Sequence, residues 1–352
     1  MVLWCLGAQW SDLVASRGWK PLMGEDAIHK TLIRRNTTQL AMSADTPFTS
    51  GKIAEEIGLD GESDHVENIL EGEFEWEGYN NFLLESSIEM KTFLQKLKRP
   101  LSNKTGKALP NIESHINLEE YKEIFNNTKE STSSHPPIHY GHYKASCESD
   151  TLASVNLAFM NIPFKYGYPL ERWRHSLHCM LQKKSKPWVN KLRIVQLFEA
   201  DFNSVLKCVL GRRLMAHSEF HELNSPQLYG SRKKKSTIEA LVMLRVMYDM
   251  ARLDRLYMVS LFNDLKGCYD KIRPSLNTIT MRRLGCPKSV AVCQAATLRT
   301  MQHALRTSLG VSKESILWDP DSYLGGIGQD SGGGPLSWHS QGIEIYTALT
   351  GD

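Results

Sequence analysis

One stretch constrains this chain more than any other, the segment Leu256–Ser275, which reads LYMVSLFNDLKGCYDKIRPS. Its apolar run from Leu256 to Phe262 ends abruptly at Asn263-Asp264. A short apolar run bounded by polar residues favours a buried β-strand, although a buried helix gives the same pattern. A carboxylate at the end of such a strand is placed to hold Mg²⁺, which prefers carboxylate and phosphate oxygens. The alternative is a turn whose acidic residues are simply solvated.

Composition and charge limit the classes of protein that come into question. The chain has 41% hydrophobic and 23% charged residues, and no apolar stretch is long enough to cross a bilayer. Residues 1–150 hold 15 Lys and Arg against 23 Asp and Glu, a net charge of −8. Residues 151–352 hold 27 against 16, a net charge of +11. A basic C-terminal part suits a polyanionic partner such as nucleic acid, and equally it keeps a surface soluble.

The cysteines and the N-terminus indicate a reducing compartment. The seven cysteines form no CxxC pair, and the apolar start Met1–Trp10 lacks the basic residues and cleavage site of a signal peptide. We therefore expect an intracellular protein with free thiols, in the nucleus or the cytoplasm, that is not secreted.

The first 129 residues predict an acidic, partly disordered region. Residues 1–53 show no clear period, and Glu55–Glu77 carries ten acidic residues without Lys or Arg, which predicts a solvated linker. Within residues 79–99, an apolar face predicts one amphipathic helix, and Leu118–Phe125 predicts a shorter one.

The composition changes from Ile138 onward. His139, His142 and Cys147 could form a metal site, although their spacing matches no standard zinc pattern. Two helices are expected next, Thr151–Ile162, ended by Pro163, and Leu170–His175.

Residues 178–197 predict a β-hairpin, because two short apolar-bearing arms flank a turn that contains Pro187. Its basic residues can clamp a triphosphate, Arg by bidentate contacts and Lys as a point charge, or they can protect an edge strand from aggregation. A helix over Phe198–Leu214 follows the hairpin. The basic residues of the hairpin are Lys183, Lys184, Lys191 and Arg193.

A basic loop precedes a strongly predicted helix at Ser236–Leu253, where Ser236 and Glu239 complete a capping box. A basic loop at a helix N-terminus directs cations and backbone N–H groups at one place, which suits a nucleic-acid backbone. An exposed charged loop without a ligand is the alternative. The loop has the sequence QLYGSRKKK and contains Arg232, Lys233, Lys234 and Lys235.

A glycine-rich segment, YLGGIGQDSGGGPLSW at residues 323–338, follows two expected helices at Ser275–Leu284 and Ser289–Thr307. It matches neither a P-loop nor a dinucleotide-binding loop. Its glycines would let the backbone approach a ligand closely beside Gln329, or they form a flexible linker.

Taken in order, these segments resemble a reverse transcriptase of the non-LTR retrotransposon kind, over roughly residues 130–340. The resemblance rests on STSSHPPIHYGHYKA, KLRIVQLFEADFNSVLKCVLGRRL, QLYGSRKKKSTIEAL, FNDLKGCYD and GIGQDSGGGP, which stand in the family's order. It implies an α+β, largely helical chain with a partial right-hand polymerase fold. Residues 130–255 would be the fingers, with a β-hairpin, and residues 256–352 an incomplete palm sheet.

The resemblance also implies an activity and its partners. The family's enzymes are RNA-directed DNA polymerases, nucleotidyltransferases that use Mg²⁺, an RNA template, a DNA primer and deoxynucleoside triphosphates. No membrane partner is implied.

Roles for individual residues follow from the same resemblance. Asp264 would be the catalytic, metal-binding carboxylate, with the backbone carbonyl of Leu265 beside it. Tyr269 would lie under the sugar of the incoming nucleotide and disfavour a 2′-OH group. Asp270 follows the family pattern without being a primary metal ligand. Three further residues would contact the nucleotide, Lys184 and Arg193 at the triphosphate and Gln329 along the nucleotide and template.

Departures from the family's pattern limit the expected activity. Asp330 and Gly334 replace the family's usual residues, and the sequence contains no Asp-Asp pair. Because the two-metal mechanism needs carboxylates from two palm strands, we expect a truncated copy that is inactive alone. The alternatives are a non-catalytic RNA- or DNA-binding remnant and an RNA-dependent RNA polymerase, against which Tyr269 argues.

The missing palm hairpin also affects folding. Without it, the strand Leu256–Phe262 would expose an unpaired apolar edge, which predicts poor solubility. The helices at residues 199–214 and 236–253 would then be the most ordered parts of the chain.

Overall fold

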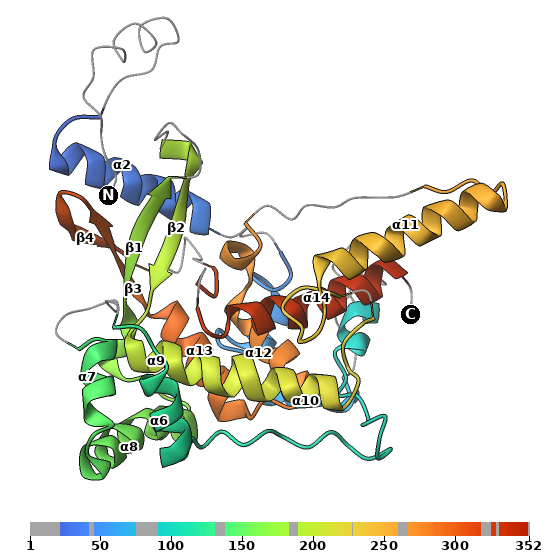
Figure 1. Cartoon of the computed structure of the whole chain (residues 1–352), viewed down its shortest axis with the longest axis horizontal. Helices are drawn as coiled ribbons and strands as arrows, with labels where there is room; N and C mark the ends of the chain where they lie inside the picture. Colours follow the sequence, from blue (N-terminus) through green and yellow to red (C-terminus); the bar gives the residue numbers. More distant parts are fainter. Residues whose placement is uncertain are drawn as a thin grey trace, which may run out of the picture.

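A computed structural model describes the greater part of the chain. The described residues are 22–41, 46–74, 91–130, 138–182, 189–226, 228–259, 267–317, 325–328 and 331–350. They form a largely helical α+β structure, as expected, and its one sheet is small, open and mixed (Figure 1).

The sheet has four strands in the order β2-β1-β3-β4. The expected hairpin at residues 178–197 is confirmed, since β1 pairs antiparallel with β2. A second hairpin, β3–β4, joins the first through parallel pairing of β1 with β3. The strands are β1 (His175–Gln182), β2 (Leu192–Leu197), β3 (Gln302–Thr307) and β4 (Gly310–Ile316).

Helix α2 (Glu25–Leu40) covers one face of this sheet (Figure 1). Its Ile28 and Leu32 are buried against Met180, Ile194 and Leu305 of the strands. Residues 1–53 show no clear helical period, so the sequence did not predict this helix. Its apolar positions are few and its mean character is polar, so only contact with the sheet distinguishes its buried face.

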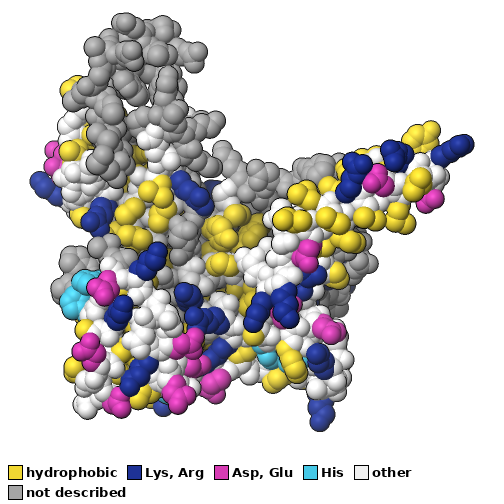
Figure 2. Space-filling model, viewed as in Figure 1, with side chains coloured by type: hydrophobic (Ala, Val, Ile, Leu, Met, Phe, Trp, Pro, Cys, Tyr) yellow, Lys and Arg dark blue, Asp and Glu magenta, His cyan; other side chains and the backbone are white. Residues whose placement is uncertain are grey.

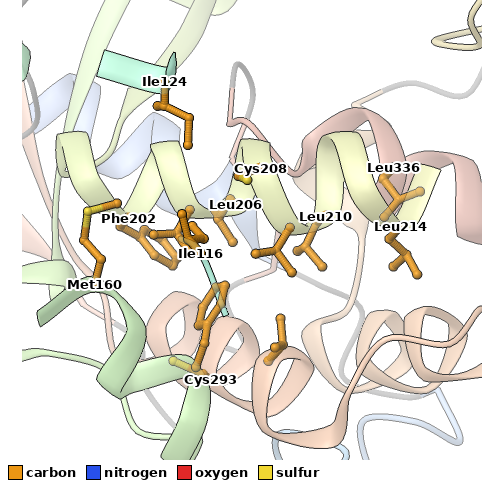
Figure 3. Packing of buried hydrophobic residues seen from close by; sticks show 14 of the residues in the cluster. Ile116, Ile124, Met160, Phe202, Leu206, Cys208, Leu210, Leu214, Cys293 and Leu336 are labelled. Atoms are coloured by element: carbon orange, nitrogen blue, oxygen red, sulfur yellow. The ribbon is translucent and has the colours of Figure 1, made fainter. Parts of the chain in front are cut away.

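A continuous helical rod crosses the centre of the largest apolar cluster (Figure 3). The helix predicted over Phe198–Leu214 is confirmed, and it extends further, to Phe220. Phe202, Leu206, Leu210 and Leu214 along the rod are all buried. The rod consists of α9 (Ala200–Leu206), the π-helix η3 (Lys207–Leu214) and α10 (Met215–Phe220).

Helices from distant parts of the sequence surround the rod. Trp173, in the short 3-10 helix η1 (Glu171–Arg174), is fully buried with its ring 4.9 Å from that of Phe202. The surrounding helices are α6 (Leu118–Asn126), α7 (Tyr140–Ser146), α8 (Asp150–Tyr166), α13 (Lys288–Arg299) and α14 (Gly334–Thr350).

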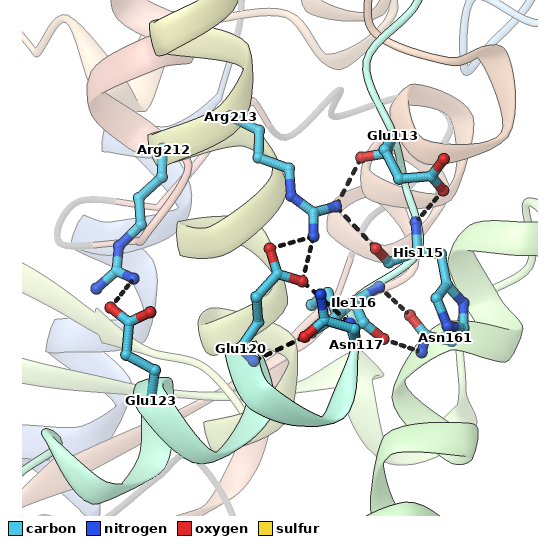
Figure 4. Close-up of polar contacts among 9 residues, drawn as sticks. All are labelled: Glu113, His115, Ile116, Asn117, Glu120, Glu123, Asn161, Arg212 and Arg213. Atoms are coloured by element: carbon cyan, nitrogen blue, oxygen red, sulfur yellow. Dashed lines mark hydrogen bonds and ion pairs between the residues drawn. The ribbon is translucent and has the colours of Figure 1, made fainter.

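The extended segment before α6 is fastened to the rod by polar contacts (Figure 4). Arg213 donates to the backbone oxygens of Glu113, at 2.8 Å, and His115, at 2.9 Å, and forms an ion pair with Glu120. The Asn161 side chain exchanges two 2.8 Å hydrogen bonds with the backbone of Ile116. Arg213 therefore satisfies backbone groups of a loop in addition to a carboxylate.

The acidic stretch at residues 55–77 is not a solvated linker over its described part, and that prediction is wrong. Helices α3 (Lys52–Ile57) and α4 (Asp64–Glu71) bury Ile53, Ile57, Val66 and Ile69 against Ile279 of α12 (Pro274–Arg283). Distant arginines supply the opposite charges that this stretch lacks. Arg282 is fully buried beside Glu67, and Arg299 holds Asp60 by a bidentate pair of 2.8 and 2.7 Å.

Helix α11 (Thr237–Leu253) forms an arm that projects from the rest of the protein (Figure 1). Its predicted capping box is present, with Glu239 N donating to Ser236 Oγ at 3.3 Å and Ser236 N to Glu239 Oε2 at 2.8 Å. None of its residues is buried, and apolar side chains cover its surface in Figure 2.

Four expected elements differ from the structure. Pro163 does not end its helix, because α8 continues to Tyr166 with Pro163 buried inside it. The helix expected to reach Thr307 ends at Arg299, since Gln302–Thr307 pairs with β1 as a strand. Of the strand expected over Leu256–Phe262, residues 260–262 lie outside the described part, and residues 256–259 adopt no strand, with Leu256, Tyr257 and Val259 exposed. The helix expected over Leu170–His175 is only one 3-10 turn.

The apolar clusters cross the expected region boundaries at 129/130 and 255/256. The central cluster joins Ile116 to Phe202 and Leu336, and the cluster of α3 and α4 includes Ile279. Of the helix expected over residues 79–99, residues 79–90 lie outside the described part, and Leu94 and Leu97 are buried.

Candidate functional site

The glycine-rich segment lies against two segments that are distant in the sequence. Gly326 N donates to the Ile272 oxygen at 2.9 Å, and Ile327 N to the Tyr269 oxygen at 3.1 Å. Gly325 N donates to the oxygen of Leu40, the last residue of α2, at 2.9 Å. The segment therefore meets the 3-10 turn η4 (Tyr269–Lys271) at the end of α2.

Only glycine fits at the closest points of this contact. Gly328 has φ +75°, and a Cβ atom there would lie 2.3 Å from Cζ of Phe198. Gly326 has φ +104°, and its Cβ would lie 3.3 Å from Cα of Asp270. Positive φ is strained for residues with a side chain, so conformation and space both require glycine here.

The same segment then crosses the central rod. Gly332 N donates to Asn203 Oδ1 at 2.6 Å, and a Cβ on Gly211 would lie 2.6 Å from the Gly332 oxygen. Gly211 is part of the π-helix η3. Since π-helical turns are frequent at functional sites, the crossing adds to the case for a site at the glycine-rich segment.

Asp270 is the buried charge of the site. Its side chain accepts a 2.7 Å hydrogen bond from Gln39 Nε2, and the residue is only 7% exposed. Burial raises the pKa of the Asp270 carboxyl, while Gln39, Lys271, Arg35 and Arg193 oppose that rise. Three cations from three elements thus act on one carboxylate, and they offset only part of the rise in pKa that burial causes.

Helix α2 supplies the residues that hold this arrangement. Arg35 donates to the backbone oxygen of Leu192 and, at 2.8 Å, to Asn36 Oδ1. Burial lowers the pKa of Arg35, and the nearby negative charge of Asp270 offsets part of that lowering. Lys271 Nζ in turn donates to the Ala41 oxygen at 2.6 Å. The end of α2 therefore links the sheet to η4.

Two residues predicted to contact a nucleotide are described, and the structure brings both to this site. The half-buried Tyr269 has its ring 6.4 Å from that of Trp338 in α14, inclined at 58°. Arg193 is exposed on β2, and its charge reaches Asp270. The other predicted residues, Asp264, Leu265, Lys184 and Gln329, lie outside the described part of the chain.

The basic loop before α11 divides into two parts. Arg232 is folded back on the protein, with Nε 2.6 Å and Nη2 2.9 Å from the two carboxylate oxygens of Glu219. It also donates to the backbone oxygens of Ser225, at 2.8 Å, and Leu228, at 3.1 Å. Lys233, Lys234 and Lys235 are exposed, so these lysines are the loop's cations that face solvent.

Sequence reasoning missed the contributions of Arg35, Gln39 and Asn203. The signal that could have found them is weak, because each is a polar residue on a helix whose partner is distant in the sequence. Gln39 and Asp270, for example, are separated by 231 positions.

Metal ligands are not clustered in the residues that the structure describes, where no group of three His, Cys, Asp or Glu could hold an ion. His139 and His142 instead form the capping box of α7. His139 Nδ1 accepts from Gly141 N at 3.1 Å, and His142 Nδ1 from His139 N at 3.2 Å. A donor set of the Asp264 carboxylate and the Leu265 carbonyl would suit Mg²⁺, because both atoms are oxygens.

Comparison with known proteins assigns no family. Neither the known family models nor the curated proteins include one that matches the chain. Among the described helices, none combines the length and the apolar character that a membrane crossing requires.

Proposed function

We propose that this protein is a reverse-transcriptase-type protein that binds a primed RNA template and a deoxynucleoside triphosphate without extending the primer. One observation carries the proposal. The segments that resemble two consecutive palm blocks of that family lie side by side, joined by the hydrogen bonds Gly326 N to Ile272 O and Ile327 N to Tyr269 O. Two blocks that build one nucleotide site are expected to meet in this way.

Charge at the site also supports the proposal. Arg193 on the hairpin, Arg35 on α2 and Lys271 on η4 all act on Asp270. A single carboxylate offsets only part of three positive charges. The excess favours an anion such as a triphosphate, which arginine binds by bidentate hydrogen bonds.

We expect no primer extension because the sequence lacks part of the carboxylate set that polymerisation needs. The 352 residues contain no Asp-Asp pair, and Asp270 already accepts from Gln39. Asp264, with the Leu265 carbonyl, would hold one Mg²⁺, which would neutralise phosphate charge. The second set of carboxylates that two-metal phosphoryl transfer requires is missing from these residues.

Nucleotide binding tests the site. Titration with a fluorescent deoxynucleoside triphosphate should give saturable binding that Arg193→Gln weakens about tenfold, the loss expected for a charge-assisted contact. The matched control is Lys313→Gln, an exposed cation on β4 of the same sheet, which should leave the affinity unchanged. Equal losses in the two variants would contradict the proposed site.

A primer-extension assay tests whether the protein lacks polymerase activity. The protein with Mg²⁺, a primed RNA template and deoxynucleotides should extend no primer above background. Extension that disappears in Asp264→Ala would show a working polymerase and overturn this part of the proposal.

A second candidate function is nucleic-acid binding without any nucleotide site. The observation in its favour is the exposed run Lys233–Lys235 at the N-terminus of α11. Reversing these three charges should lower RNA affinity and reduce the salt slope by up to about three. Reversing the exposed Lys30, Lys129 and Lys313 is the matched control. RNA binding that depends on the loop, in a protein that binds no triphosphate, would favour this second function.

A further inference from the structure

The outer surface of α8 carries a row of large apolar side chains that the described part of the chain does not cover. The exposed fraction is 57% for Leu152, 49% for Val155, 53% for Phe159, 46% for Ile162 and 62% for Tyr166. The spacing alternates between three and four residues, which places all five on one stripe of the helix.

This row is separate from the face that α8 contributes to the core. Ala153, Leu157, Met160 and Phe164 are buried in the central cluster on the other side of the helix. The exposed row leaves on the order of 500 Å² of apolar surface, which is at the upper end for a monomer. Folding of one copy therefore does not explain the row.

We propose that two copies of this chain associate through α8, with the two helices antiparallel. A three-four spacing is the seam of a coiled coil, so its natural occupant is another helix with the same spacing. The row is also nearly symmetric about its centre, since Leu152 and Tyr166 both lie seven residues from Phe159, while Val155 and Ile162 lie four and three residues from it. A two-fold axis at Phe159 sets Phe159 against its copy, Leu152 against Tyr166 and Val155 against Ile162.

Charge favours the same arrangement. No charged residue occurs between Asp150 and Lys165, so pairing of the rows buries no unpaired charge. In the antiparallel arrangement, Lys165 of one copy lies within a helical turn of Asp150 of the other. The Asp150 side chain is 75% exposed beside Lys122 and has room for a second cation. Antiparallel helices also bring opposite ends of their dipoles together.

The neighbouring side chains permit close approach. Ser154 and Ala158 are small, exposed residues beside the row, and Tyr168, 78% exposed, extends the apolar surface beyond the end of the helix. These additions bring the surface toward the roughly 800 Å² that each partner buries in a stable dimer. Helix α11 also exposes many apolar residues, but they spread over most of its circumference, so no single stripe marks where a partner helix would pack.

Sedimentation of the full chain tests the association. We expect a concentration-dependent monomer–dimer equilibrium that Phe159→Glu weakens at least tenfold, since it sets two like charges together at the axis. Because Phe159 is exposed, the variant should keep the wild-type circular dichroism spectrum. The matched control is Met247→Glu on α11, 53% exposed, which should leave the dimer intact. A dimer lost in Met247→Glu and kept in Phe159→Glu would place the interface on α11 and overturn the proposal.

Disulfide trapping tests the direction of the helices. Under oxidation, Phe159→Cys should form a covalent dimer above the wild-type background. Leu152→Cys and Tyr166→Cys should cross-link when mixed, and neither should do so alone. Cross-linking of Leu152→Cys with itself would show a parallel pair and contradict the antiparallel arrangement.

Other occupants of the row would also contradict the proposal. A wild-type protein that stays monomeric at all concentrations, and that floats with phospholipid vesicles unless Phe159 is changed to Glu, would identify the row as a membrane-binding surface.

Discussion

The central rod and helix α11 have similar apolar sequences and opposite surroundings. Six of the seven residues of α9 are buried at the start of the rod, whereas α11 has no buried residue. Both were expected to be the most ordered parts of the chain. The comparison shows that an apolar helix sequence determines that a helix forms and leaves open what, if anything, covers it.

The two helices are therefore stabilised in different ways. The rod is held by its packing against α6, α8, α13 and α14. Helix α11 depends on local interactions, the capping box at Ser236 and the Arg245–Asp249 ion pair at 2.9 Å. Such terms contribute about 0.3–2 kcal/mol each, and an isolated helix of this length is marginal in water.

The largest expected difference between the two regions is the response to truncation of an apolar side chain. Phe202→Ala in the rod should lower the free energy of unfolding by about 3–5 kcal/mol, because it leaves a cavity beside Trp173. Val246→Ala on α11, where Val246 is 45% exposed, should change it by less than about 0.5 kcal/mol. Urea unfolding measures both. Equal losses would show that α11 is covered in solution.

The next effect is the contribution of Glu199, the residue that precedes the rod, to the pH dependence of stability. Burial, together with the neighbouring Asp201 carboxylate, raises the pKa of Glu199 to about 7, and Arg172 opposes the rise. The folded protein therefore binds a proton that the unfolded chain releases near its ordinary pKa, so stability should fall between about pH 5 and pH 8.

Glu199→Gln should remove most of this pH dependence. The matched control is Glu239→Gln on α11, an exposed carboxylate, which should retain it. The urea midpoints of the wild type and both variants, measured at several pH values, show whether Glu199 causes the pH dependence. A wild-type midpoint that rises over this range relative to that of Glu199→Gln would have the wrong sign.

The smallest expected effect concerns the cap of α11. Ser236→Ala removes the acceptor of the capping box and should destabilise that helix locally by about 1 kcal/mol, with little change in global unfolding. Hydrogen exchange should become faster in α11 alone. In the wild type, amides of the rod should exchange far more slowly than those of α11, because the rod opens only with the core. Slow exchange in both helices would contradict the difference in burial.

Features that depend on neighbours in the sequence could be predicted. The hairpin at β1–β2, the rod and α11 follow from apolar spacing, and the capping box from Ser236 and Glu239. Part of the candidate site was also identified from the sequence, Arg193 and the glycines from residue type and Tyr269 from the family resemblance. The roles given to Asp264, Lys184, Leu265 and Gln329 stay predictions, because these residues lie outside the described part of the chain.

The sequence by itself determined the hairpin β1–β2, the rod and the start of α11, because a cap or an apolar period acts within a few residues. Only the tertiary structure decided that Gln39 reaches Asp270, that Arg282 and Arg299 neutralise the acidic helices, and that Gln302–Thr307 is a strand. Each of these contacts joins distant residues, and its free energy depends on the whole set of contacts formed at once. The same reason explains why the rod is buried and α11 is not.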